Sequence, residues 1–311
     1  MNKNLIVITG PTAGGKTALA LKIAEYADVE LISADSRQVY QYMNIGTAKP
    51  TETELKSVKH HLIDIIKPDE EFSAGKFAEV AINLVNDIKS RNKIPVVVGG
   101  TGFYIKALFE GLSDLETDDD NEKRLEIREE LNLELEKFGK DYLYGMLMSD
   151  DPESAQKYSD KNPRRVIRAI EYFRLTGNKF SDTFGLEEPS GFIPQYYVIN
   201  PPREDLYKKI NSRTETMFGN GLIREVAGIL EMGYAPMLNS LNTVGYKECI
   251  SMIYGEIPLE RAIELTKQNT RRYAKRQVTW LNQIAKFEPI MNTNANKIKE
   301  IINNYSIEET D

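Results

Sequence analysis

The chain has 311 residues, of which 41% are hydrophobic and 28% charged, and its net charge is −7 at pH 7. This balance predicts a globular protein and excludes disorder as its main state, because so much apolar side chain can bury a core. The single cysteine, Cys249, excludes a disulfide framework and a multi-cysteine zinc site.

The sequence carries no targeting signal that we recognise. No apolar run approaches the roughly 18 residues of a membrane span. The N-terminal apolar run is short and lacks the cleavage site of a signal peptide. We therefore expect a cytoplasmic protein that has no membrane partner.

The first 100 residues alternate between strand and helix patterns. Short apolar runs predict strands at 5–8, 29–32 and 94–98, and apolar residues at helical spacing predict helices at 17–27 and 72–90. The last of these strands is wholly apolar, which is typical of a parallel strand covered on both faces. The alternation predicts an α/β protein with a doubly wound parallel sheet.

The texture of the sequence changes after residue 111. Residues 112–195 are acidic, then basic, and mostly helical in pattern, and we expect them to form a helical insertion domain. Residues 1–111 and 196–311 would form the core, with a returning strand at 196–200 and helices at 205–218, 222–232 and 258–286. The stretch 114–136 holds eleven acidic and three basic residues, and no role for it follows from the sequence.

A phosphate-binding loop stands between the first predicted strand and helix. Its residues, Gly10, Pro11, Thr12, Ala13, Gly14, Gly15, Lys16 and Thr17, fit the pattern G-x-x-x-x-G-K-[ST]. Backbone N–H groups and the helix N-terminus would form an anion cradle, to which Lys16 adds charge. The Thr17 hydroxyl could ligate Mg²⁺. The motif is typical of ATP-binding P-loop proteins, but the strand at 94–98 lacks the acid that Mg²⁺-bound ATP requires.

Polar residues follow the second predicted strand. Asp35 lies at the carboxyl end of the sheet, where α/β proteins bind ligands, although alone it reads more readily as a turn or cap than as a general base or metal partner. Residues 35–40 and 46–50 add donors suited to base edges and phosphates. His60 and His61 cannot share one helix face, so we expect a surface turn or a capping histidine rather than a zinc site.

Two segments are basic. Asn162 and Pro163 predict the start of a helix. Helical spacing places Arg164, Arg165, Arg168 and Tyr172 on one face and Val166, Ile167, Ile170 and Phe173 on the other. An arginine face with an aromatic ring suits RNA, but a solvated helix face is an equal alternative. The second basic run covers residues 267–286. Nothing local distinguishes Arg213 from a surface arginine.

Taken together, these segments resemble the bacterial tRNA dimethylallyltransferases, also called isopentenyl-diphosphate:tRNA transferases, along nearly the whole chain. The segments that carry the resemblance are 10–17, 35–40, 46–50, 60–64, 98–104, 162–168, 244–246 and 275–281. The family's loop usually has serine where this chain has Gly14, a change that we expect to cost little because that position acts mainly through its backbone. The implied fold is a P-loop NTPase-like parallel sheet core with a helical insertion.

The resemblance implies transfer of a dimethylallyl group from its diphosphate to the exocyclic N6 of the adenine just 3′ of a tRNA anticodon. The P-loop would hold the leaving diphosphate rather than ATP, with Mg²⁺ as cofactor on Thr17. Lys16, Thr101 and Arg213 would stabilise the leaving group, and Asp35 would act as the base. The adenine has to leave its stack to react.

The resemblance also implies the partner surfaces. The tRNA would be gripped at its anticodon stem-loop, which in this family favours an A-A-A run. The residues assigned to it are Asp35, Ser36, Arg37, Gln38, Thr101, Arg164, Arg165, Val166, Ile167, Arg168, Lys275 and Arg276. A monomer is the expected state.

Three alternatives stay open at this point. A P-loop kinase of a small metabolite would use the insertion as a lid, but the missing acid counts against it. A prenyltransferase of free adenine nucleotides would not need the insertion or the basic C-terminal helix. A nucleotide-switched RNA-binding protein would carry a base-specificity motif such as Asn-Lys-x-Asp, which this sequence does not show.

Overall fold

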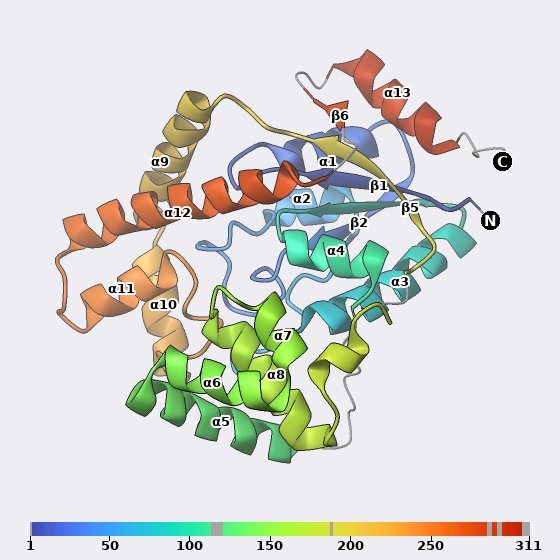
Figure 1. Cartoon of the computed structure of the whole chain (residues 1–311). Helices are drawn as coiled ribbons and strands as arrows, with labels where there is room; N and C mark the ends of the chain where they lie inside the picture. The colour runs from blue at the N-terminus through green and yellow to red at the C-terminus, as the bar shows by residue number, and fades with distance from the viewer. Residues whose placement is uncertain (1, 113–120, 187–188, 285–287, 291–293, 307–311) are drawn as a thin grey trace. The chain divides into compact units, whose positions relative to one another are not determined.

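The computed structural model describes residues 2–112, 121–186, 189–284, 288–290 and 294–306. The chain forms two compact units (Figure 1). The first comprises Met1–Phe109 and Pro189–Asp311, and the second comprises Glu110–Glu188. The predicted insertion ended at residue 195, whereas strand β5 (Ile193–Val198) already belongs to the first unit. Residues 114–120 of the acidic stretch lie outside the described residues.

The first unit is built on a parallel sheet. Among the described residues it has six strands in the order β3-β2-β4-β1-β5-β6, and every neighbouring pair is parallel. Besides β5, these are β1 (Asn4–Thr9), β2 (Val29–Ala34), β3 (His60–His61), β4 (Ile94–Gly99) and β6 (Glu288–Pro289). The predicted α/β class is confirmed, and the first three predicted strands lie within two residues of their observed bounds.

The expectation of a surface turn at His60 and His61 was wrong. Both residues pair with β2 as the edge strand β3. The His61 Nε2 atom lies 2.7 Å from the Oε2 atom of Glu30, a buried residue of β2 that also binds Arg91. A two-residue strand is too short to leave a periodic pattern in the sequence, so tertiary pairing alone reveals it.

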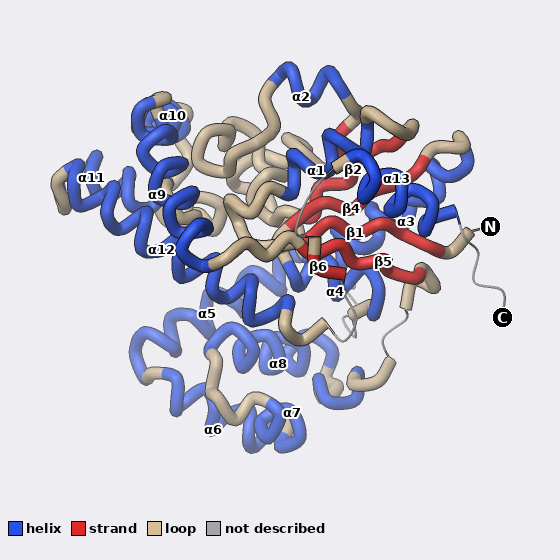
Figure 2. Tube along the Cα trace, turned by 90° about the horizontal axis from the view of Figure 1, so that it is seen from above, coloured by secondary structure: helices blue, strands red, loops and turns tan. Residues whose placement is uncertain are grey.

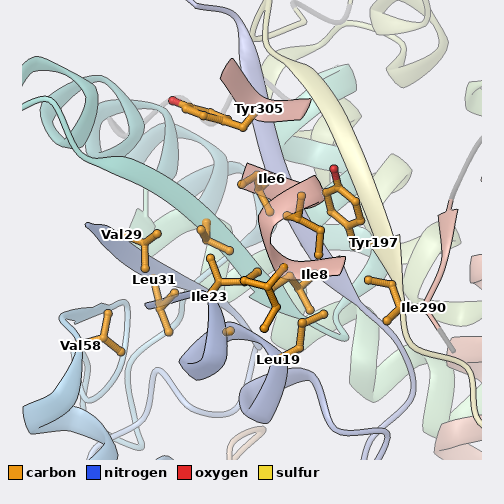
Figure 3. Packing of buried hydrophobic residues seen from close by; sticks show 14 residues of the cluster. Ile6, Ile8, Leu19, Ile23, Val29, Leu31, Val58, Tyr197, Ile290 and Tyr305 are labelled. Atoms are coloured by element: carbon orange, nitrogen blue, oxygen red, sulfur yellow. The ribbon is translucent and has the colours of Figure 1, made fainter. Parts of the chain in front are cut away.

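Helices cover both faces of the sheet (Figures 1 and 2). Helices α1 (Lys16–Ala24) and α13 (Ala295–Ser306) pack on one face, where Ile6 and Ile8 of β1 meet Ile23 and Tyr305 (Figure 3). Helices α3 (Ala74–Ser90) and α4 (Gly102–Glu110) cover the other face. Alternate residues of a strand point to opposite faces, so a strand covered on both sides is apolar along its length, as β4 and residues 5–8 of β1 are.

The C-terminal half of the first unit is helical. The short helix α2 (Glu52–Ser57) lies earlier in the chain. The helices of the C-terminal half are α9 (Arg203–Gly219), α10 (Leu222–Glu231), α11 (Tyr246–Ile253) and α12 (Leu259–Leu281). Three of these match predicted helices, whereas α11 was not predicted. Residues 285 and 286, at the end of the predicted last helix, lie outside the described residues. Helices α10 and α11 share a core with Val39, Tyr40 and Met43.

The second unit is helical and has a hydrophobic core of its own. It contains α5 (Asn121–Phe138), α6 (Lys140–Asp150), α7 (Pro152–Lys157), α8 (Pro163–Thr176) and the 3-10 helix η2 (Phe180–Thr183). Leu131, Leu143, Leu147 and Ile170 are completely buried in that core. The predicted start of α8 is confirmed, since Asn162 Oδ1 accepts a hydrogen bond from the Arg164 N–H at 3.1 Å.

None of the helices in these described ranges is long and apolar enough to cross a membrane.

Asp151 links α7 to η2 inside the second unit. Its buried carboxylate accepts hydrogen bonds from the Ser154 N–H at 3.1 Å, the Ser154 hydroxyl at 2.5 Å and the Ser181 N–H at 2.8 Å. These bonds lower the carboxyl pKa against the effect of burial, which raises it. A buried acceptor of this kind fixes two chain segments at once.

We expect Asp151→Ala to destabilise the protein by about 2–4 kcal/mol, because it leaves buried donors without an acceptor. Urea unfolding followed by circular dichroism measures this loss. Asp182→Ala is the matched control, because Asp182 is exposed one residue beyond Ser181. Equal losses in the two variants would contradict the role given to Asp151.

Candidate functional site

Three segments leave the sheet together at its carboxyl edge. Gly99, the last residue of β4, pairs with Thr9 of β1 on one side and with Ala34 of β2 on the other. The residues that follow these strands are the phosphate loop at 10–17, the segment that begins at Asp35, and the turn through Thr101. Parallel strands bring their following loops to one edge of a sheet, which is where α/β proteins bind ligands.

The phosphate loop has a backbone that only glycine tolerates at two points. Gly10 has a φ of 155°, and a Cβ there would lie 2.3 Å from the carbonyl oxygen of Ile199. Gly15 has a φ of 108° and is the N-cap of α1, so the free N–H groups of the first helical turn face the loop. The loop therefore has the anion-cradle geometry that the sequence predicts.

Gly14 closes a turn of the phosphate loop. Its N–H donates to the carbonyl oxygen of Pro11 at 3.0 Å, and a Cβ at this position would lie 2.8 Å from that same oxygen. A serine cannot enter this loop without a shift of the Pro11 carbonyl. This clash concerns the reverse change, from glycine to serine, so the expectation that glycine costs little at this position stays a prediction.

Lys16 reaches back along the loop. Its Nζ atom donates to the carbonyl oxygens of Gly10 and Pro11, each at 3.0 Å. Burial lowers the pKa of Lys16 to about 8, with Asp35 opposing the shift and Arg213 adding to it. A diphosphate oxygen in the loop would restore the full charge on this ammonium group.

Arg213 comes to the loop from α9, about 200 positions away in the sequence. Its Nη1 atom lies 3.5 Å from the Thr12 hydroxyl. Burial lowers the pKa of the guanidinium, which Asp35 partly offsets. Two basic side chains of the described residues therefore converge on the loop, although nothing in the local sequence distinguishes Arg213 from a surface arginine.

Asp35 stands between two cavities. A cavity of about 240 Å³ is lined by Asp35, Ser36, Arg213 and Tyr273 among others. A smaller cavity of about 50 Å³ is lined by Asp35, Lys16 and Thr17 among others. The Asp35 Oδ1 atom accepts a hydrogen bond from the Arg37 N–H at 2.9 Å, which fixes the carboxylate. One carboxylate thus faces both the phosphate-loop lysine and a pocket large enough for an organic group.

Thr101 holds the Asp35 segment from the β4 side. Its hydroxyl oxygen accepts a hydrogen bond from the Ser36 N–H at 3.0 Å, and its own N–H donates to the carbonyl oxygen of Ala34 at 3.2 Å. The half-buried Tyr273 of α12 hydrogen-bonds to the Thr101 side chain. Burial, with Asp35 nearby, raises the Tyr273 pKa to about 12, so the phenol keeps its proton at neutral pH. Tyr273 was not among the predicted site residues.

The side chains of Arg37 and Gln38 have different surroundings. The Arg37 side chain lines the larger cavity and donates to the Asn239 carbonyl oxygen at 2.7 Å. The Gln38 amide accepts from the Ser33 hydroxyl at 3.0 Å and donates to the carbonyl oxygens of Thr47 and Ala48 at 3.3 and 3.2 Å. Gln38 therefore fixes a neighbouring loop, a use that its position in the sequence does not reveal.

Gln277 joins the phosphate loop to the β4 turn, a role that was not predicted from the sequence. Its Oε1 atom accepts from the Thr12 N–H at 2.8 Å, and its Nε2 atom donates to the Gly100 carbonyl oxygen at 2.9 Å. A Cβ at Gly100 would lie 2.2 Å from that Nε2 atom. The resemblance covers this position within 275–281, but no pattern in one sequence marks an amide as a bridge.

The two basic residues of α12 that were predicted to bind tRNA line different cavities. Arg276 lines the larger cavity, and its guanidinium lies 5.6 Å from the Tyr273 ring centre. Lys275 is exposed and lines a different cavity, with Pro202 and Tyr207. Adjacent helical positions point about 100° apart, so one basic run serves two surfaces.

The second unit corrects several predicted RNA-binding residues. Val166 and Ile167 are 1% and 7% exposed and belong to the hydrophobic core, so their side chains are not available to a partner. Tyr172, expected on the arginine face, is buried edge-on against Phe180 of η2, with ring centres 5.4 Å apart. The helical wheel missed this because it omits η2, which covers the end of α8.

Arg168 has a structural partner. It donates to Glu171 Oε1 at 2.7 Å, and Glu171 is fully buried and also receives Arg124 and Arg128 of α5 at 2.9 and 2.8 Å. These three arginines, with burial opposing them, hold the pKa of Glu171 below its usual range. Arg164 and Arg165 are exposed. Arg164 and Arg165 are therefore the most accessible part of the predicted arginine face.

The smaller cavity suits a magnesium ion that arrives with a phosphate ligand. Thr17 offers a hydroxyl and Asp35 a carboxylate there. Among the residues that the structure describes, no group of three His, Cys, Asp or Glu side chains gathers to hold a metal. Mg²⁺ usually keeps several waters and takes one or two protein oxygens together with substrate phosphates, so this donor set fits it.

The Lys16 pKa predicts a pH-dependent affinity for pyrophosphate. Lys16 is charged below a pH of about 8 and loses its proton as the pH rises above that value. We expect pyrophosphate affinity to fall across this window, because an uncharged amine no longer attracts the anion. Calorimetric titrations between about pH 6.5 and 9.5 measure it. Lys16→Met is the control, because pyrophosphate's own titration is common to both proteins. An identical pH profile in the variant would refute the assignment.

The Gln277 bridge predicts a binding defect without loss of the fold. We expect Gln277→Ala to weaken pyrophosphate binding by about tenfold, because the Thr12 amide loses its acceptor and the loop its fixed position. Calorimetry measures the affinity and thermal unfolding checks the fold. The exposed Gln283→Ala serves as control. Unchanged affinity in Gln277→Ala would show that the bridge does not shape the loop.

The comparisons with known proteins agree with this geometry. The sequence profile described as IPP transferase matches residues 38–284. The chain is 44% identical over 285 residues to the tRNA dimethylallyltransferase of Acetivibrio thermocellus, covering 90% of this chain and 89% of the relative. It is 43% identical over 280 residues to that of Clostridioides difficile, covering 90% and 88%.

Solved structures give the same result. The tRNA delta(2)-isopentenylpyrophosphate transferase of Staphylococcus epidermidis has a TM-score of 0.68 and 38% identity, covering 97% of this chain and 98% of its own. A eukaryotic dimethylallyltransferase acting on tRNA has a TM-score of 0.82 and 30% identity, covering 97% of this chain and 79% of its own. With the fold, the phosphate loop and these relatives in agreement, the chain belongs to the tRNA dimethylallyltransferase family of IPP transferases.

Proposed function

We propose that this protein transfers a dimethylallyl group from dimethylallyl diphosphate to the exocyclic N6 of the adenine 3′-adjacent to a tRNA anticodon. The protein is a prenyltransferase of the tRNA dimethylallyltransferase family. The observation that carries the residue assignments is the position of Asp35, which lines both the cavity of Lys16 and Thr17 and the larger cavity beside it.

The donor half of the reaction belongs to the phosphate loop. The allylic C–O bond breaks and its electron pair leaves with the diphosphate, so negative charge grows on the leaving oxygens. Lys16 and Arg213 lie where they can stabilise that charge, in a site where burial already lowers the pKa of both. Mg²⁺, bound through Thr17 and the diphosphate, would supply further Lewis-acid stabilisation.

The acceptor half of the reaction belongs to Asp35. The new bond forms between the adenine N6 and the allylic carbon, and one N6 proton has to leave. Asp35 would accept that proton, since it borders the larger cavity, where the adenine would enter. Thr101 would keep Asp35 and Ser36 in place through the Ser36 N–H bond at 3.0 Å.

The partner would be the anticodon stem-loop. The exposed Arg164 and Arg165 of the second unit, and Arg276 beside the larger cavity, offer charge to phosphates and a surface for unstacked bases. The adenine has to be extruded from its stack to reach a site of this depth. We expect the protein to act as a monomer, and a tRNA substrate supports a place in the cytoplasm.

The alternatives from the sequence are not favoured. The family match and the names of the relatives support a tRNA prenyltransferase rather than a metabolite kinase or a free-nucleotide prenyltransferase. No observation at the site points instead to a nucleotide switch, and the β4 turn carries Gly100 and Thr101 where ATP-bound magnesium needs an acid.

The direct test is a product analysis. The protein is incubated with Mg²⁺, dimethylallyl diphosphate and an unmodified anticodon stem-loop that carries an A-A-A run. After digestion of the RNA, mass spectrometry should detect an adenosine heavier by one dimethylallyl group. Free AMP as acceptor and ATP in place of the donor are the controls. Product on AMP but not on the stem-loop, or ATP hydrolysis without any prenyl transfer, would overturn the proposal.

Two variants separate chemistry from RNA binding. Asp35→Asn keeps the oxygen that accepts the Arg37 N–H but loses the base, so we expect kcat to fall by about 10²–10⁴-fold with little change in RNA affinity. Arg165→Ala should weaken RNA binding and reduce the salt slope by about one, with kcat at saturating RNA nearly intact. Single-turnover kinetics and salt titrations measure both. Equal losses of rate and affinity in the two variants would contradict these roles.

A further inference from the structure

One half-buried carboxylate holds a loop that borders the larger cavity. Glu225 of α10 accepts hydrogen bonds from three successive backbone N–H groups of the loop: Ile45 at 2.8 Å and Asn44 at 3.0 Å on Oε2, and Gly46 at 3.3 Å on Oε1. The Oε1 atom also accepts from the Tyr246 hydroxyl at 2.6 Å. Four donors converging on one carboxylate make a charge-assisted network that fixes the loop backbone.

Tyr246 closes the network from α11. Its side chain is completely buried, and a Cβ added to Gly46 would lie 2.3 Å from its ring. The ring therefore limits how the Gly46 backbone can move, and only glycine fits against it. Burial first, and then Glu225, raise the pKa of Tyr246, so its hydroxyl stays a donor to Glu225 at neutral pH.

The same loop is fixed from its other side by the segment that carries Asp35, the proposed general base. Gly46 and Thr47 line the larger cavity together with Asp35 and Ser36. Gln38, three residues after Asp35, donates to the Thr47 and Ala48 carbonyl oxygens. Glu225 and Tyr246 thus hold one end of the wall that stands beside Asp35, whereas Gln277 holds the phosphate loop.

We propose that Glu225 and Tyr246 are positioning residues for the acceptor, which set the Gly46–Thr47 wall of the larger cavity and thereby the approach of the adenine to Asp35. This inference rests on the proposed function. The two side chains act through the loop backbone. Their loss should therefore disturb use of the RNA acceptor more than use of the prenyl diphosphate, which the phosphate loop binds.

The test compares two near-isosteric variants in steady-state kinetics with the anticodon stem-loop. Glu225→Gln replaces one carboxylate oxygen by an NH₂ group. That group cannot accept the hydrogen bonds that the carboxylate oxygen accepts in the wild-type protein. We expect kcat/KM for the RNA to fall by about tenfold or more, while KM for dimethylallyl diphosphate stays within about threefold. Tyr246→Phe keeps the ring against Gly46 and removes one donor, so its loss should be smaller and again confined to the RNA acceptor.

Two controls keep a structural explanation apart. Glu30→Gln changes a buried glutamate of the first unit, which binds Arg91 and His61 at the start of β2 and away from the carboxyl edge of the sheet. It should lower the unfolding temperature without an acceptor-selective defect. The Glu225→Gln, Tyr246→Phe double variant should lose little more than Glu225→Gln alone, because both residues belong to one network.

The outcomes are distinct. A selective RNA defect in Glu225→Gln, with non-additive losses in the double variant, supports the inference. Equal defects for both substrates, additive losses, or the same pattern in Glu30→Gln would overturn it and leave the proposed function intact. If the wild-type chain forms no prenylated adenosine on the stem-loop, the proposed function fails, and this inference fails with it.

Discussion

The site depends on the pairing of Gly99 with strands on both of its sides. Thr9 and Ala34 stand opposite the same residue, so β1, β4 and β2 end at one level of the sheet. A Cβ at Gly99 would lie 2.1 Å from the Ala34 carbonyl oxygen, so the close approach itself requires glycine. The phosphate loop, Asp35 and Thr101 follow these three strand ends. Their proximity is a consequence of parallel topology rather than of sequence distance.

Helices from the far end of the chain complete this edge. Arg213 of α9 brings charge to the phosphate loop, Gln277 of α12 ties that loop to the β4 turn, and Glu225 of α10 fixes the loop beside Asp35. Each contributes a preformed interaction in a largely buried setting, where charges and dipoles act more strongly than in water. Burial lowers the pKa of both Lys16 and Arg213, because the site shields these cations from water.

The second unit shows how one helix divides its side chains between structure and surface. Glu171 draws three arginines of α5 and α8 onto one buried carboxylate. All three arginines donate to that carboxylate, so Arg124 and Arg128 have a structural role inside an otherwise acidic stretch. Arg164 and Arg165, one turn before Arg168 in α8, are exposed on the surface.

The sequence by itself determined the local parts of this protein. Apolar runs and glycine spacing were enough to predict the α/β class, the first three strands and the phosphate loop, and Asn162 and Pro163 were enough for the start of α8, because each depends on neighbouring residues. Only the tertiary structure decided which distant side chains meet. It buried Tyr172, made His60–His61 an edge strand, and brought Arg213, Glu225, Tyr273 and Gln277 to the site. The reason is physical: such contacts depend on how helices pack across the chain, and local periodicity carries no record of the partner.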